Sequence, residues 1–71
     1  MASWEQSVYS SMAQSISYDS DSQVMIVTFN TGKSYAYAGV PEDVAQEAAN
    51  AASVGEYLNE NIKGRYSFRR L

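Results

Sequence analysis

Basic and aromatic side chains alternate near the C-terminal end of this 71-residue chain. The run consists of Lys63, Arg65, Tyr66, Phe68, Arg69 and Arg70. Basic side chains contact phosphates, and aromatic rings stack on unpaired bases. The interleaved pattern is therefore typical of a surface that binds single-stranded nucleic acid.

Two further rings, Tyr35 and Tyr37, stand two residues apart, so they share one face of any strand that contains them. Strand-borne rings stack bases in some RNA-binding domains, which makes both tyrosines candidates for the same surface. The alternative is that both rings pack in the core, with their hydroxyls at its rim. The core alternative is favoured, because a domain of this size needs its large apolar groups for packing.

The residue types that usually carry covalent and metal chemistry are missing. The chain has no histidine and no cysteine, so a nucleophile–base pair would need Ser, Thr, Lys or a carboxylate, and the usual zinc ligands are absent. Residues 19–23 begin like a calcium loop, but Val24 and Asn30 occupy the positions of its glycine and its last acid. We predict a turn there, and a non-catalytic protein without a cofactor or a bound metal.

Charge is unevenly distributed along the chain, whose net charge is −3. Residues 1–56 contain seven acids and one base, whereas residues 57–71 contain one acid and four bases. The basic tail either meets an anionic partner or folds back over the acidic body. No apolar run approaches the ~20 residues of a membrane span, and the first residues lack a signal-peptide pattern. We expect a cytoplasmic protein with no membrane contact.

A single α+β domain over residues 1–71 must position these side chains. Residues 1–14 are polar and irregular, and are predicted to be a lead-in segment. Residues 15–40 predict a three-stranded antiparallel β-meander, because a β-branched run at 24–29 is flanked by turn formers at 19–22 and 30–33. Both connections are too short for a parallel crossover.

Residues 41–63 predict two α-helices packed on one face of this sheet. Pro41 suits the first turn of a helix, and Ser53 with Glu56 has the spacing of a capping box at the start of the second. Gly64 suits the position after its end. Residues 64–71 then form the short basic C-terminal tail. The apolar stripe predicted for the first helix consists of Val44, Ala48, Ala51 and Ala52.

Several short motifs occur in a specific order along most of the chain. They are Ser10-Ser11, residues 16–19, the strand through Phe29, Tyr35-Ala-Tyr37, Val40-Pro41, the region of Gly55, Asn61-Ile62 and Gly64-Arg65-Tyr66. This ordered set resembles the KTSC domain family, a small module named for its occurrence at the C-terminus of some lysyl-tRNA synthetases. The family also includes free-standing bacterial and phage proteins. The resemblance implies RNA binding through the synthetase association, and it implies no catalytic residues.

Two hypotheses follow from the sequence. The first is a non-catalytic binding module that contacts RNA through the tail and through Tyr35 and Tyr37. The second is a protein–protein interaction or structural module, such as a phage, prophage or bacterial accessory protein, which binds a protein partner or forms a homodimer. RNA binding predicts a complex that salt weakens, whereas a protein interface predicts a complex that survives salt.

Overall fold

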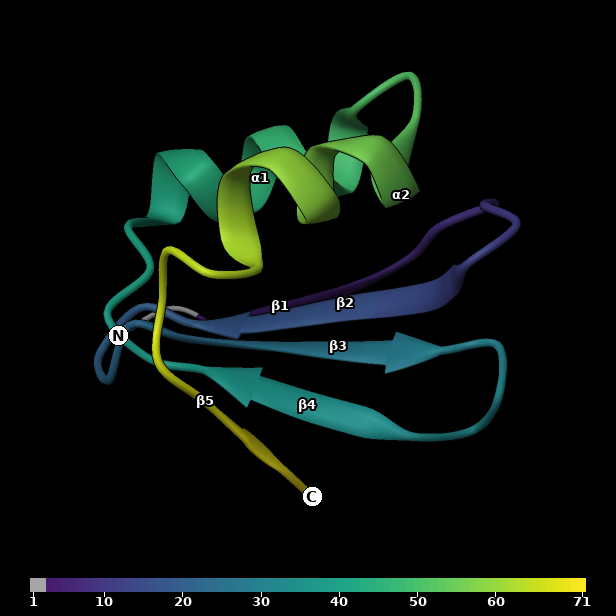
Figure 1. Ribbon diagram of the computed structural model, residues 1–71. Coiled ribbons are helices and arrows are strands. Elements are labelled where there is room, and N and C mark those ends of the chain that lie inside the picture. Colours follow the sequence, from purple (N-terminus) through teal and green to yellow (C-terminus); the bar gives the residue numbers. More distant parts are fainter. Residues whose placement is uncertain (1–2) are drawn as a thin grey trace.

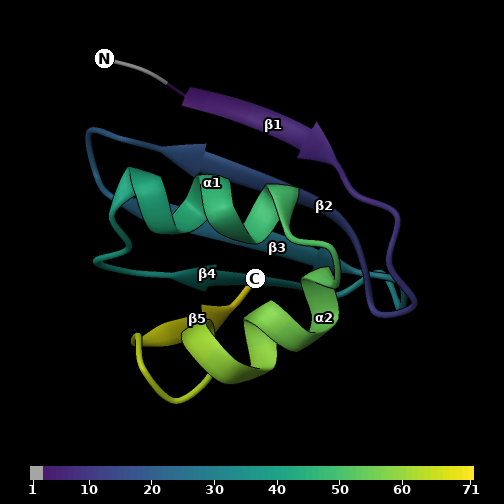
Figure 2. The same ribbon diagram turned by 90° about the horizontal axis from the view of Figure 1, so that it is seen from above.

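The computed structural model describes residues 3–71, in which an antiparallel sheet carries helices on one face (Figure 1). The strands are β1 (Ser3–Ser7), β2 (Ala13–Asp19), β3 (Val24–Phe29), β4 (Ser34–Tyr37) and β5 (Phe68–Arg70). They lie in the order β1-β2-β3-β4-β5, and every neighbouring pair is antiparallel. The helices are α1 (Glu42–Asn50), α2 (Val54–Tyr57) and a π-helical continuation, η1 (Leu58–Ile62). Seen from above, α1 lies over β2 and β3, and α2 lies toward the β4–β5 side (Figure 2).

The predicted α+β class is confirmed, but the predicted three-stranded sheet is wrong. The β2–β3–β4 meander is the centre of a five-stranded sheet, because each end of the chain adds an edge strand. In β1 only Trp4 is half-buried, and the three residues of β5 are all exposed. Edge strands of this kind are held mainly by backbone hydrogen bonds, so they carry little of the apolar alternation that marks a strand in a sequence.

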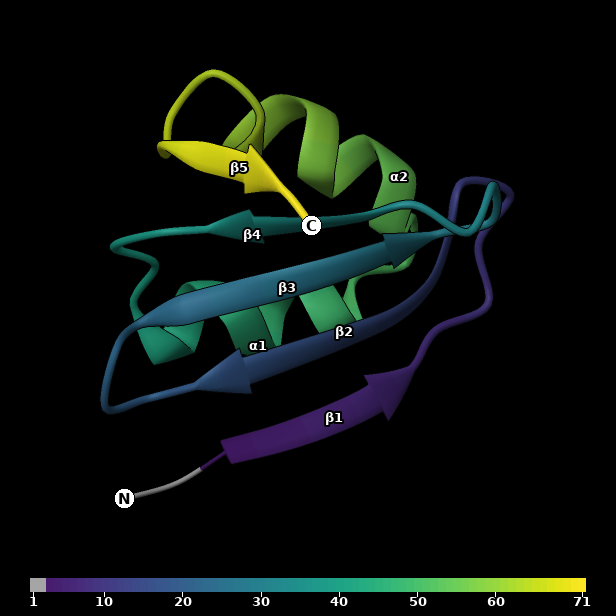
Figure 3. The same cartoon turned by 90° about the horizontal axis from the view of Figure 1, so that it is seen from below.

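The core lies between the helices and one face of the sheet. Residues opposite each other in neighbouring strands share a face, and the pairs Met25–Tyr37 and Val27–Tyr35 belong to the face beneath the helices. The largest fully buried side chains are Ile16, Met25, Val27, Val40, Leu58 and Ile62. No helix covers the other face, which Figure 3 shows from below. Among the described residues, no helix is long and apolar enough to cross a membrane.

Helix α1 begins at Glu42, one residue later than predicted, because Pro41 keeps an extended ψ of 153° and serves as the N-cap. Its buried residues are Ala45, Ala48 and Ala49. Val44 is half-buried against the core, so the predicted stripe is correct at Val44 and Ala48 and wrong beyond Ala48. The helix ends at Asn50, so the two following alanines lie in the turn toward α2 rather than on its buried face.

The predicted start of the second helix is confirmed. Ser53 is its N-cap, and the Glu56 amide donates a hydrogen bond to the Ser53 hydroxyl oxygen (3.4 Å). At the other end the Lys63 amide donates to the Leu58 carbonyl (2.8 Å), a π-type bond that closes η1. Gly64 then has φ +81°, a left-handed conformation that glycine adopts without strain. The chain can therefore turn back sharply from η1 toward β5.

Replacement of Ser53 by alanine removes this cap, and we expect the free energy of unfolding to fall by about 0.5–2 kcal/mol. The measurement is the urea midpoint of wild type and of Ser53→Ala. Ser53→Asp is the matched control, because an aspartate carboxylate caps the same amide. A midpoint unchanged in Ser53→Ala would mean that the hydroxyl contributes nothing to the start of α2.

Alkaline pH should destabilise the fold through Tyr18. Burial, followed by the negative charges of Glu42, Asp19 and Asp43, raises the pKa of its hydroxyl above the ordinary value of 10.0. That hydroxyl donates a 2.6 Å hydrogen bond to the Val40 carbonyl. Because the folded-state pKa is the higher one, the stabilisation is fully present below pH 10 and is lost as the pH rises through the raised pKa.

We therefore expect the urea midpoint to fall above about pH 10, the ordinary tyrosine pKa. The comparison protein is Tyr18→Phe, which cannot ionise at this position. It should be less stable at neutral pH because it lacks the hydrogen bond, and its midpoint should fall less steeply between pH 9 and 11. Parallel pH profiles for the two proteins would show that Tyr18 ionisation does not contribute.

Candidate functional site

Strand β5 decides where the side chains of the basic tail lie. It pairs antiparallel with β4, so that Phe68 is opposite Tyr37 and Arg70 is opposite Tyr35, whereas Arg69 is opposite Ala36. Since opposed residues share a face, Phe68 and Arg70 lie on the helix side of the sheet with the two tyrosines. Arg69 lies on the open face. The tail thus folds back onto residues 34–37 of the acidic body, where it extends the sheet as an edge strand and does not cover the helices.

Four rings form a continuous cluster along this edge of the sheet. The Tyr35 ring stacks on Phe68 (centroids 5.5 Å apart, planes at 30°) and meets Phe29 edge-to-face (5.5 Å, 89°). Tyr37 contacts Phe68 at 5.8 Å. Phe68 remains 59% exposed, although it touches both tyrosines. The cluster therefore presents at least one large ring to solvent at the sheet edge.

The two tyrosines do not have equal roles. Tyr37 is 3% exposed and belongs to the core, and burial raises the pKa of its hydroxyl. It therefore offers no free ring face for stacking, which matches the core interpretation favoured by the sequence. Tyr35 is only half-buried and packs against the edge of the same core. Of the predicted pair, Tyr35 is the ring that remains partly accessible.

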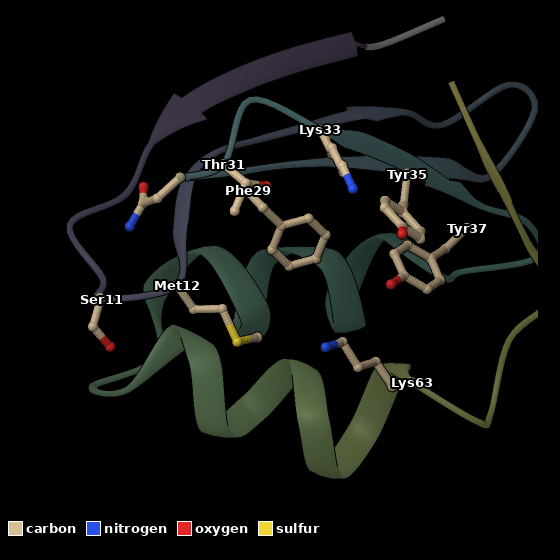
Figure 4. Close-up of a pocket in the computed structure, with 9 residues that line it drawn as sticks. Ser11, Met12, Phe29, Thr31, Lys33, Tyr35, Tyr37 and Lys63 are labelled. Atoms are coloured by element: carbon tan, nitrogen blue, oxygen red, sulfur yellow. The ribbon is translucent and has the colours of Figure 1, made fainter.

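A cleft of about 570 Å³ opens between the β3–β4 hairpin and η1 (Figure 4). Phe29, Tyr35 and the edge of Tyr37 form its aromatic side, and Met12 closes it near the loop before β2. The amino groups of Lys33 and Lys63 both point into it. The Lys63 amino group lies over the Phe29 ring, 5.5 Å from its centroid, which is a cation–π contact.

The charge of the cleft is opposite to that of the protein. Among the described residues that line it, two are basic and none is acidic, whereas the chain carries a net charge of −3. Acidic side chains act elsewhere, since the charges of Glu42, Asp19 and Asp43 add to burial in raising the pKa of the Tyr18 hydroxyl. Positive charge beside aromatic rings can bind an anionic ligand with a planar group.

The structure brings together some of the predicted site residues and separates others. Lys63, Phe68, Arg70 and Tyr35 belong to the cleft and the adjoining sheet edge, with Tyr37 buried behind them. We call Lys33, Lys63, Arg70, Phe29, Tyr35 and Phe68 the basic aromatic edge. Its Phe29 and Lys33 were not predicted for the site. The predicted hairpin at 30–33 was the available signal, because it places these two residues beside Tyr35.

The other tail residues lie elsewhere. In the turn after η1, Arg65 donates from Nε to the Glu60 carbonyl (3.3 Å). Tyr66 is half-buried and packs against the core, so its ring is used structurally. The stretch at 19–23 is a turn, as predicted, in which the Asp21 amide donates to Asp19 Oδ1 (3.0 Å). Within residues 3–71 no cluster of acidic side chains is arranged to hold a metal ion.

Comparison with known proteins gives consistent matches. The family model for the KTSC domain matches residues 9–66. The crystal structure of a KTSC domain protein from Yersinia pestis superposes with a TM-score of 0.89 at 37% identity, covering 99% of both chains. A protein of Stutzerimonas stutzeri is 35% identical over 57 residues, which are 80% of either chain.

Longer proteins also contain a matching segment. A lysine–tRNA ligase of Nostoc punctiforme is 34% identical over 61 residues, and that of Trichormus variabilis is 37% identical over 54 residues. These segments cover 86% and 76% of this chain. The chain spans only 11% and 10% of the length of these two ligases.

Proposed function

This chain belongs to the KTSC domain family, and on that premise we propose that it is a non-catalytic module that binds single-stranded RNA. The observation that carries the proposal is the basic aromatic edge, where three cations and three rings from distant parts of the chain meet. Relatives named lysine–tRNA ligase contain a matching segment, and their name makes RNA the class of partner to test first. The activity of those ligases is not inferred for this chain.

Single strands suit this site better than duplexes. Stacking on rings requires unpaired bases, and the exposed Phe68 ring offers aromatic surface beside Arg70. A duplex binder would instead need a basic helix or ribbon that enters a groove. Here α2 and η1 carry Glu56 and Glu60, which phosphates would repel. The proposal therefore assigns base contacts to the rings and phosphate contacts to Lys33, Lys63 and Arg70.

The same residues support a binding role rather than catalysis. The cleft offers lysines, tyrosines and small polar groups, with no acidic residue among the described residues that line it. The chain has no histidine or cysteine, so a general base poised near neutral pH would have to come from a carboxylate or a lysine with a strongly shifted pKa. We infer that the site holds a ligand without transforming it.

The salt dependence of RNA binding tests the proposal. Each phosphate contact on a single strand contributes a slope of about −0.7 to log affinity against log salt, so three contacts predict a slope of about −2.1. We would measure the affinity for a labelled, unstructured oligoribonucleotide by fluorescence anisotropy, in a series of salt concentrations from about 20 to about 300 mM. No binding at the lowest salt would overturn the proposal, and so would binding that salt does not weaken.

One observation favours a second function. The open face of the sheet carries half-buried Val24 and Ile26 beside Ala36, so a small apolar strip lies on a face that no helix covers. We propose as the alternative a protein–protein interaction module that uses this strip, in a homodimer or with a protein partner. Light scattering after gel filtration at low and high salt separates the two functions. A dimer that persists at about 0.5 M salt would favour the alternative. A monomer at both salt concentrations would exclude the homodimer.

A further inference from the structure

We propose that the cleft between the β3–β4 hairpin and η1 holds one unstacked nucleotide, with its base against Phe29 and with phosphate contacts to Lys33 and to Lys63, which in an RNA strand come from two successive phosphates. The inference rests on the proposed function and deepens it, because it assigns a single-nucleotide site within the basic aromatic edge. The ligand chemistry is an aromatic base joined to a phosphate. A free nucleoside monophosphate and one nucleotide of an RNA strand share this chemistry.

The Phe29 ring is the base-binding surface in this account. It is half-buried at the end of β3, and the Lys63 amino group lies over it at 5.5 Å. Cation–π contacts extend to about 6 Å, so this one is near the outer limit, and it belongs to an exposed lysine. A planar base can take the place of the amino group on the ring. The displaced ammonium then lies at the rim of the cleft, where a phosphate can pair with it.

The packing of the other rings limits the site to one base. Tyr35 is stacked on Phe68 on one side and touches Phe29 on the other. Tyr37 is buried beneath it. RNA-binding sheets that stack several bases in a row present their rings on an uncovered face. In this protein the corresponding face is covered by α1, α2 and η1 (Figure 2), so consecutive bases cannot lie along it.

Size and charge fit a nucleotide. The cleft volume of about 570 Å³ lies within the range of about 300–1,000 Å³ that small-molecule sites have. Lys33 and Lys63 reach it from opposite walls, the hairpin and the end of η1 (Figure 4). Since none of the described lining residues is acidic, no carboxylate neutralises them within the cleft. Ser11, Asn30 and Thr31 also line the cleft, and polar side chains of these types can bond to a base edge.

Methionine methyl NMR provides a direct test, because two methionines report on different places. Met12 lines the cleft, whereas Met25 is fully buried in the core. With ¹³C-methyl-methionine protein, titration with AMP should shift the Met12 methyl signal and leave that of Met25 unchanged. Adenosine and ribose 5-phosphate, each lacking one half of the ligand, should bind at least fivefold more weakly than AMP. An unmoved Met12 signal at millimolar AMP overturns the inference, as does ribose 5-phosphate binding as tightly as AMP.

Variants assign the contacts. Phe29→Leu keeps an apolar side chain but removes the ring, and Lys33→Gln removes one cation; each should weaken AMP at least fivefold. Arg69→Gln is the matched control, because it removes one positive charge from the open face and should leave AMP affinity unchanged. The native Met25 shift verifies the fold of each variant. If Phe29→Leu and wild type bound AMP with equal affinity, the base would not lie against the Phe29 ring, and the inference would be overturned.

The two sources of the nucleotide are separated by repeating the titration with an unstructured oligoribonucleotide. If the oligonucleotide binds and AMP does not shift Met12, the single-nucleotide site is overturned while RNA binding stands. If AMP shifts Met12 and the oligonucleotide does not bind at low salt, the nucleotide site is supported as a site for free nucleotides, and the proposed RNA function is overturned.

Discussion

Replacing Tyr37 by alanine is expected to lower the free energy of unfolding by about 3–5 kcal/mol, the usual range for deleting a buried aromatic ring. Tyr37 is 3% exposed, lies opposite Met25 in the sheet and contacts the Phe68 ring. A 71-residue domain has a total stability of roughly 4–11 kcal/mol, from about 0.05–0.15 kcal/mol per residue. The variant should therefore lose a large part of its stability, measured as the urea midpoint at neutral pH.

The matched control is Tyr37→Phe. It keeps the buried ring and removes only the hydroxyl that lines the cleft, so its midpoint should remain close to that of wild type. If Tyr37→Ala instead had near-native stability, the ring would have to be exposed in solution. Tyr37 would then again be a candidate for stacking on RNA bases.

Removing two cations of the basic aromatic edge is expected to weaken single-stranded RNA binding about 25-fold at 0.1 M salt. Each phosphate contact contributes about 0.7 to the slope of log affinity against log salt, which corresponds to about fivefold at 0.1 M relative to 1 M salt. The variant is Lys63→Gln/Arg70→Gln, and its slope should be less negative by about 1.4. Anisotropy titrations over a series of salt concentrations measure both quantities.

The control variant is Arg65→Gln/Arg69→Gln, which changes net charge by the same amount. Arg65 bonds to a helix carbonyl and Arg69 lies on the open face, so neither belongs to the basic aromatic edge. Its affinity should change less than about threefold, through long-range electrostatics alone. Equal losses in the two variants would show that only total charge matters. A larger loss in the control variant would place the RNA on another face.

The centre of the fold could be predicted because its turns, strands and helix start carry local sequence signals. The β3–β4 hairpin has Gly32 at φ +90°, as a short turn between two strands requires, and Met25, Val27 and Tyr37 alternate onto the buried face. Ser53 marked the start of α2 because an N-cap bonds within its own turn. Such signals depend on residues close together in the sequence.

The edge strands could not be predicted, because their stability depends on pairing with distant segments. Ser3–Ser7 and Phe68–Arg70 bury few side chains, and neither shows an apolar alternation. The same limit explains the site. The sequence showed that cations and rings alternate in the tail, but only the β4–β5 register separates Arg70 from Arg69 and joins Arg70 to Tyr35. Lys33 stands alone among polar turn residues in the sequence, and only the fold places it in the same cleft as Lys63.

The most direct test of the account is an amide-resolved NMR titration of the labelled protein with a short unstructured RNA, first at low and then at physiological salt. The account predicts salt-sensitive shifts at residues 29–37, at Lys63 and at residues 68–70, while β1 and α1 remain unchanged. The account would be contradicted if no amide shifted at low salt, where electrostatic contacts are strongest. Shifts confined to β1, α1 or the open face would contradict it equally.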